Sequence, residues 1–151
     1  MHPRYILCSV VILFSIATAH AGAWGHKSFQ NDDALDWVEN SLKTGGQSAV
    51  ERAVLRVAKG RGYLEAPEAS YAIAACEVLA AAQGRSSPDL PEEVAILAKT
   101  LPSTVKDEVR KSARDAIERV LGDQSELNEL WMDSKDFQDW KKCVESLKTR
   151  I

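Results

Sequence analysis

Three aspartates, Asp32, Asp33 and Asp36, stand close enough in the sequence to act together on a metal ion. Asp32 and Asp36 are four residues apart, so on a helix they share one face. Carboxylate oxygens are the ligands that hard cations such as Mg²⁺ prefer. The cluster is also typical of a helix start, where Asn31 or Asp32 caps the backbone and the acids favour the positive end of the helix dipole. Helix capping is the favoured interpretation.

The Asp-Asp-x-x-Asp string resembles the string by which prenyl-transferring helical enzymes hold magnesium. Those enzymes are far longer and carry a second acidic motif, which this chain lacks. A metal-assisted enzyme that uses Asp32, Asp33 and Asp36 therefore stands as the alternative hypothesis for function.

A second acidic group consists of Glu65, Glu68 and Glu77. Glu77 lies between Cys76 and Val78 in a segment predicted to be buried, and a buried carboxylate is costly unless it is paired or hydrogen-bonded. We expect Glu77 either to meet a cation such as Arg52 or Arg56, or to face a polar pocket. Glu68 and Glu77 are the acids that an enzyme would add to the aspartate cluster.

The remaining side chains suited to chemistry are few. His26 is the single histidine after residue 21, and no His-Cys-Asp group with zinc spacing or Ser-His-Asp set accompanies it. We expect His26 to lie in a loop, and Trp24 to be the tryptophan that could line a surface groove. No catalytic set, metal site or cofactor is predicted.

Residues 1–21 have the pattern of a cleavable secretory signal peptide. Arg4 precedes an apolar block that runs from Ile6 to Ala17, and Ala19-His20-Ala21 forms a small-x-small cleavage site. A membrane anchor is the rival interpretation, but a spanning helix needs about 20 apolar residues and this block is shorter. Cleavage after Ala21 would send the chain to the periplasm or the extracellular space, with no stable membrane insertion.

Residues 22–151 then form one domain. The whole chain has a formal net charge of −3, and loss of Arg4 makes the domain one unit more negative. An acidic domain is not expected to bind nucleic acid, which requires clustered Lys and Arg. Cys8 leaves with the leader. Cys76 and Cys143 either pair as a disulfide in an oxidising compartment or, the favoured interpretation, remain separate small apolar residues.

Apolar residues recur with helical periodicity along this domain, and no segment shows sustained strand-like alternation. The stripes, the glycines and the prolines predict an all-α, compact single-domain bundle of six to seven short helices. Ser48 and Glu51 are expected to form a capping box at the start of the second helix. The expected helices are 31–44, 48–59, 67–83, 91–101, 102–121, a short one around 127–131, and one from 134 onward.

Four strings in order resemble a small bacterial family, the domain of unknown function numbered forty-two fifty-nine. They are Gly22-Ala-Trp24-Gly25, Phe29-x-Asn31-Asp32-Asp33-Ala34-x-Asp36-Trp37, Tyr63-Leu-Glu-Ala-Pro67 and Ser125-Glu-Leu-x-x-Leu130-Trp131. Family members usually begin just before the first string and look cytosolic, whereas this chain carries a leader there. The resemblance implies a fold and not an activity.

The absence of a catalytic set, the small size and the acidic surface favour a non-enzymatic, exported domain that binds a protein or peptide partner. An inhibitor or immunity-type role is one version of this hypothesis. A third hypothesis is an envelope component without a soluble ligand, and no residue pattern in the sequence supports or opposes it.

Overall fold

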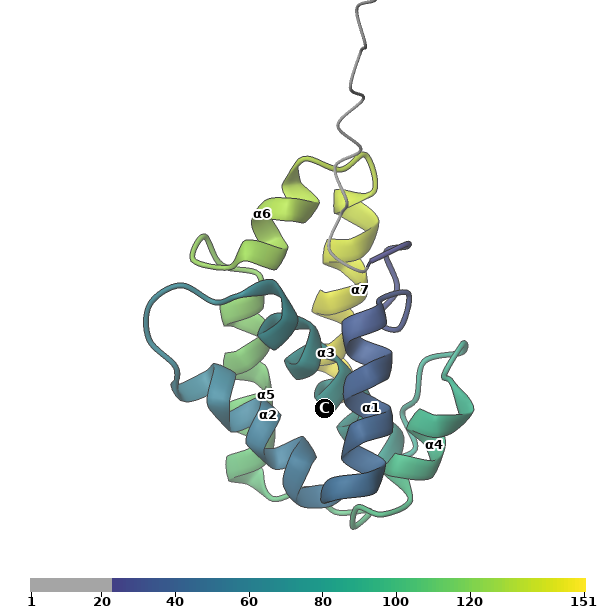
Figure 1. Cartoon of the computed structure of the whole chain (residues 1–151). Helices are drawn as coiled ribbons and strands as arrows, with labels where there is room; N and C mark the ends of the chain where they lie inside the picture. Colours follow the sequence, from purple (N-terminus) through teal and green to yellow (C-terminus); the bar gives the residue numbers. More distant parts are fainter. Residues whose placement is uncertain (1–22) are drawn as a thin grey trace, which may run out of the picture.

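The computed structural model describes residues 23–151, so the predicted leader at residues 1–21 lies outside the described residues. The described residues form one all-α domain (Figure 1). Its helices are α1 (Asp32–Thr44), α2 (Gln47–Lys59), α3 (Ala66–Ala82), α4 (Glu92–Ala98), α5 (Asp107–Val120), α6 (Glu126–Met132) and α7 (Phe137–Arg150). The predicted fold class is thereby confirmed. Among these helices, none combines the length and the apolar character that crossing a bilayer requires.

Helix α3 is the central element of the domain. Its 17 residues are apolar nearly all round, and Pro67 stands in its first turn, where a missing N–H leaves no helical hydrogen bond unmade. Helices α1, α2, α4, α5, α6 and α7 all contact α3. A helix without a polar face is stable when neighbours cover most of its surface, and 12 of its 17 residues are buried here.

The turn between α1 and α2 does not contain the expected capping box. Helix α2 begins at Gln47 with Gly46 as its N-cap residue, and the Ser48 hydroxyl donates to the Gly45 carbonyl oxygen over 3.0 Å. Gly46 has φ of 48°, a left-handed conformation that favours glycine, and its N–H bonds to the Ser41 carbonyl. The tight turn therefore places the helix start before Ser48 can act as a cap.

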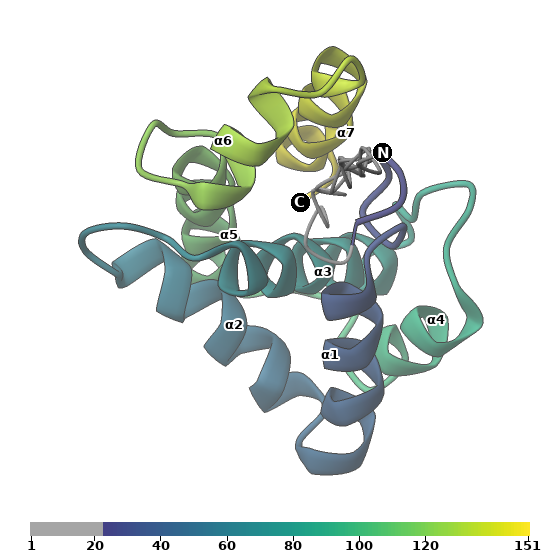
Figure 2. The same ribbon diagram turned by 45° about the horizontal axis from the view of Figure 1, so that its top comes forward.

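Helices α1 and α2 are joined at one end and diverge toward α3, which crosses between their far ends (Figure 2). They contact each other little, although each packs extensively on α3. The axes of α1, α2 and α3 thus form the three sides of a triangle in Figure 2.

The segment before α1 folds back against the domain. Ala23 and Asn31 form an isolated antiparallel bridge, and the N–H of Trp24 donates to the Gln30 carbonyl oxygen over 3.0 Å. Asn31 then caps α1, since its Oδ1 accepts from the N–H of Ala34 and its Nδ2 donates to Ser70 Oγ of α3. These bonds fix the segment beside α3, where it borders two of the hollows described next.

Candidate functional site

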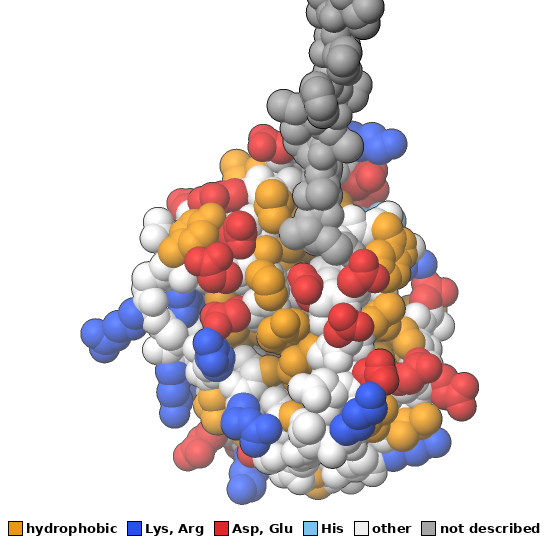
Figure 3. Space-filling model, viewed as in Figure 1, with side chains coloured by type: hydrophobic (Ala, Val, Ile, Leu, Met, Phe, Trp, Pro, Cys, Tyr) orange, Lys and Arg blue, Asp and Glu red, His pale blue; other side chains and the backbone are white. Residues whose placement is uncertain are grey.

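The space between α1 and α2 is a surface groove, which we call the α1–α2 groove. It has a volume of about 600 Å³, and α3 forms its floor. Its lining includes the half-buried apolar and aromatic side chains Trp37, Ala53, Leu55 and Tyr71. The rings of Trp37 and Tyr71 stack with their centroids 6.4 Å apart. Figure 3 shows hydrophobic side chains exposed on this face, with acidic and basic side chains around them.

The predicted aspartate cluster lies at the start of α1, one turn before the groove residue Trp37, and none of its three members lines the groove. Burial, followed by the charges of Asp36 and Asp32, raises the pKa of Asp33. Burial also raises the pKa of Tyr71 on the groove floor, and the charges of Asp33, Asp36 and Glu68 add to this effect. The structure therefore brings two of the predicted aspartates and Glu68 into the surroundings of one tyrosine.

These acids do not form a metal site. Within residues 23–151, no group of three or more His, Cys, Asp and Glu side chains is arranged to hold a metal ion. Glu68 instead forms a close ion pair with Arg56 of α2. The aspartates occupy the first turns of α1 behind the Asn31 cap, as the capping interpretation expects.

Glu77 belongs to a separate site, which we call the Glu77 pocket. The side chain is 1% exposed, and its partner is Arg150 of α7 rather than Arg52 or Arg56, so the expected partners were wrong. Arg150 Nη1 donates to Glu77 Oε2 over 2.8 Å, and Nη2 donates to Oε1 over 2.9 Å. Ser28 Oγ also donates to Oε1 over 2.9 Å. Both carboxylate oxygens are thus satisfied in a two-pronged pair.

The electrostatics of this pair favour its charged form. Hydrogen bonding to Glu77 raises the pKa of Arg150, and this effect, with the charge of Glu77, outweighs the opposing effect of burial. Both oxygens of the Glu77 carboxylate are already engaged by the guanidinium of Arg150 and the hydroxyl of Ser28. We therefore assign the Glu77–Arg150 pair to stability and not to acid–base chemistry.

The Glu77 pocket itself is a hollow of about 680 Å³ among the N-terminal segment, the loop before α4 and helix α7. His26 lines it, as does Cys143, whose Sγ lies 3.8 Å from Ser28 Oγ. Lys27 and Asp89 form a close ion pair between the N-terminal segment and the loop before α4. His26 therefore lies in a loop, as expected, and borders a pocket.

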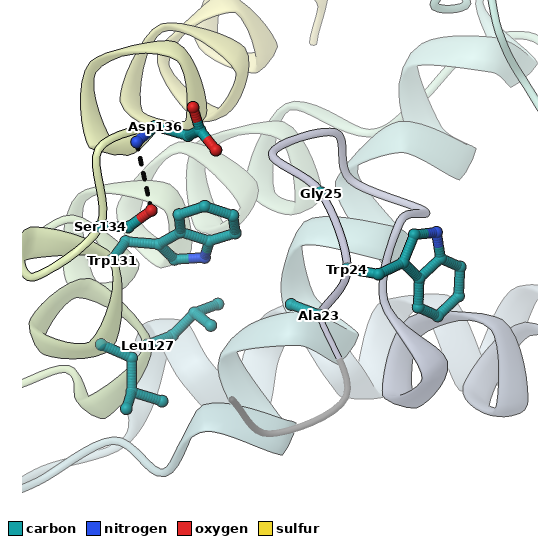
Figure 4. A pocket seen from close by; sticks show the side chains of 8 residues that line it. Ala23, Trp24, Gly25, Leu127, Trp131, Ser134 and Asp136 are labelled. Carbon is teal, nitrogen blue, oxygen red and sulfur yellow. Dashed lines mark hydrogen bonds between the residues drawn. The ribbon is translucent and has the colours of Figure 1, made fainter. Parts of the chain in front are cut away.

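Trp24 borders a smaller hollow of about 220 Å³ beside α6. Figure 4 shows the indole of Trp131 and the side chain of Leu127 facing the chain at Ala23, with the indole of Trp24 on the other side of that segment. The Trp24 side chain is 58% exposed. Trp24 thus borders a surface hollow whose lining includes neither Glu77 nor the aspartates of α1.

The two cysteines among residues 23–151 are free. Cys76 is buried in α3, whereas Cys143 is partly exposed on α7. Burial, and to a smaller extent the charge of Glu77, raises the pKa of the Cys76 thiol. Cys76 behaves as a small apolar residue, while Cys143 is accessible from the Glu77 pocket.

Sequence reasoning missed several residues of these sites. Arg150 was not connected with Glu77, because nothing in a sequence links two residues 73 positions apart. Helical periodicity predicts that Trp37 faces the core together with Ala34 and Val38, whereas Trp37 is half-buried and lines the α1–α2 groove.

One sequence pattern could have indicated the groove. Arg52 and Arg56 are four residues apart, so they lie on one face of α2 and mark that face as polar.

The fold and the surface hollows define the class of protein to which the chain belongs: a small all-α protein of one domain. The described residues form surface grooves but no metal-binding cluster. The particular family follows from sequence comparison. The family described as Domain of unknown function (DUF4259) matches residues 22–143, and the chain belongs to this family. The resemblance drawn from the four strings is confirmed.

Wider comparisons give no further relatives. No curated protein matches the chain, and no solved structure matches it.

Proposed function

We propose that this protein is an exported, non-enzymatic helical domain that binds a protein or peptide partner. Export rests on the leader pattern of residues 1–21, with its apolar block and the Ala19-His20-Ala21 cleavage site. The same pattern makes the periplasm or the extracellular space the compartment in which the partner is met.

The observation that carries the binding proposal is the α1–α2 groove. Two helices that bury their apolar faces against each other would leave no such groove, but α1 and α2 diverge and leave Trp37, Leu55 and Tyr71 half-exposed. Apolar grooves between helices are a recurrent way for proteins to bind peptides. A volume of about 600 Å³ is large enough for several partner side chains.

The proposal is tested by photo-crosslinking in the native compartment. A photoreactive amino acid is placed at Asn40, which is exposed and lines the groove, and in a control chain at Lys111 on α5. We expect a discrete crosslinked product from position 40 and none from position 111. The proposal is overturned if no product forms at position 40 and the purified protein turns over a substrate.

An inhibitor or immunity-type role is a version of this proposal. It predicts that the crosslinked partner has an activity of its own, which falls when the purified protein is added. A partner whose activity is unchanged would leave the binding proposal standing and remove this version of it.

A further inference from the structure

The walls of the α1–α2 groove differ in charge. Helix α1 carries Asp33 and Asp36. Each of them lies four residues, about one helical turn, before a residue that lines the groove, and therefore on the same side of the helix as that residue: Trp37 for Asp33 and Asn40 for Asp36. Within the described residues, neither aspartate takes part in an ion pair. The α1 side of the groove therefore continues, toward the N-terminal end of the helix, into unpaired negative charge.

Helix α2 forms the opposite, basic wall. Arg52 and Arg56 both line the groove, and Arg56 is already paired with Glu68. Arg52 donates from Nη1 to Ser48 Oγ over 3.1 Å and, in the described part of the chain, has no carboxylate partner. The groove thus has an apolar floor between one wall with unpaired carboxylates and one with an unpaired guanidinium.

The walls offer no backbone hydrogen bonds to an occupant. The N–H and C=O groups of α1 and α2 bond within their own helices, so an extended peptide laid between them would find only side-chain partners, such as Asn40 and Arg52, for its backbone groups. A helix satisfies its backbone internally, so it loses none of these bonds when it enters. The groove chemistry therefore selects a helical occupant.

We propose that the α1–α2 groove binds an amphipathic helix of a partner protein, with basic residues along one edge of its apolar stripe and acidic residues along the other. The basic edge faces α1 and the acidic edge faces α2, while the apolar stripe covers Trp37 and Tyr71. This inference rests on the proposed function and specifies the partner segment.

The test uses the purified protein and four labelled synthetic helices, each of 17 residues to match the length of α3. The first has an apolar stripe with one basic and one acidic edge. The second and third have the same stripe with two acidic or two basic edges, and the fourth has the mixed edges with a serine and glutamine stripe. Fluorescence anisotropy at low salt is expected to show binding of the first at least about tenfold tighter than that of any other.

Charge-reversal variants locate the binding. Asp36→Lys is expected to weaken the mixed-edge helix about tenfold and to tighten the helix with two acidic edges, because the α1 wall then becomes basic like α2. Arg52→Glu is expected to favour the helix with two basic edges. Glu108→Lys on α5, an exposed position outside the groove, is the matched control and should change none of the affinities. Circular dichroism verifies that each variant is folded.

Several results would overturn the inference. Equal binding of the first three helices would remove the role of charge, and binding of the serine and glutamine helix would remove the role of the apolar floor. Self-association that is lost in Asp36→Lys would make a second copy of the chain the occupant. If no helix binds although position 40 still crosslinks to a partner, the helical occupant is wrong and the proposed function stands.

Discussion

At the scale of single residues, the Glu77 carboxylate imposes the strictest requirement on the chain. It is buried in α3, and each of its oxygens accepts a hydrogen bond from Arg150 of α7. Removing one partner of a buried ion pair leaves the other charge without compensation, which costs far more than the pair contributes as a whole. The side chain of Arg150 is 20% exposed, so water offsets part of that cost.

We expect Arg150→Met to lower the free energy of unfolding by about 2–3 kcal/mol, because Glu77 is left buried and charged. Glu77→Met/Arg150→Met should recover most of that loss, since no charge then remains in the core. Urea unfolding followed by circular dichroism measures both. Asp115→Asn, which breaks the exposed pair with Lys111, is the control and should cost no more than about 0.5 kcal/mol. A double variant no more stable than Arg150→Met would contradict this account.

The two cysteines allow a second residue-scale prediction. The raised pKa of the Cys76 thiol leaves little of the reactive thiolate, and burial blocks access, whereas Cys143 borders the Glu77 pocket. We expect iodoacetamide to label Cys143 alone in the folded protein and both cysteines in urea, as read by mass spectrometry. Protein purified without reductant in which neither thiol is labelled even in urea would instead indicate the Cys76–Cys143 disulfide.

The residue scale is also where prediction from sequence was weakest. The cost of burying Glu77 was foreseeable from its apolar neighbours, and so was its need for a cation. The identity of that cation was not, because α7 is brought to α3 only by packing of the whole domain. Local features did better, since Asn31 caps α1 through its own neighbour Ala34.

At the scale of elements, α3 determines the architecture. Its apolar positions are distributed around the whole helix, so most of its surface must be covered, and six other helices contact it. This followed from the sequence, as did the approximate ends of most helices, although α4 ends at Ala98 and not at residue 101, and α5 begins at Asp107 and not near residue 102. The exact start of α2 did not, because it depends on the backbone conformation of Gly46 rather than on the residues of the capping box.

We expect Leu79→Ala to lower the free energy of unfolding by about 3 kcal/mol, because it leaves a cavity in the centre of the domain. Leu79 is 1% exposed, whereas Ile96 on α4 is 45% exposed. Ile96→Ala removes a side chain of the same size and should cost less than half as much. Thermal or urea unfolding of the two variants measures the difference, and equal losses would show that α3 is not the centre of the core.

At the scale of the whole molecule, the divergence of α1 and α2 leaves each helix with two faces that carry apolar residues. One face stabilises the domain, and the other is available to a partner. Each helix buries one face on α3 and leaves part of another toward the groove. The helical periodicity of apolar residues in the sequence predicts that the face on α3 and the face toward the groove both carry apolar residues. It does not tell which apolar residues remain half-exposed, and for this reason it predicts Trp37 in the core.

The leader gives a prediction for the molecule as it is made. When the whole chain is expressed in a bacterium with an export pathway, we expect the protein outside the cytoplasm to begin at Gly22. Intact-mass measurement after fractionation determines the N-terminus. Ala19→Lys/Ala21→Lys alters the small residues of the cleavage site and should yield uncleaved chain, while Lys142→Ala should be processed normally. Full-length protein in the cytosol alone would contradict export.

The distance in sequence between Glu77 and Arg150 has a consequence for synthesis. A ribosome delivers the first of these residues 73 positions before the second, so a nascent chain that has not reached α7 carries a carboxylate in its future interior with no counter-ion. The Glu77–Arg150 pair can form only after residue 150 has been made, so it cannot stabilise any earlier stage of folding.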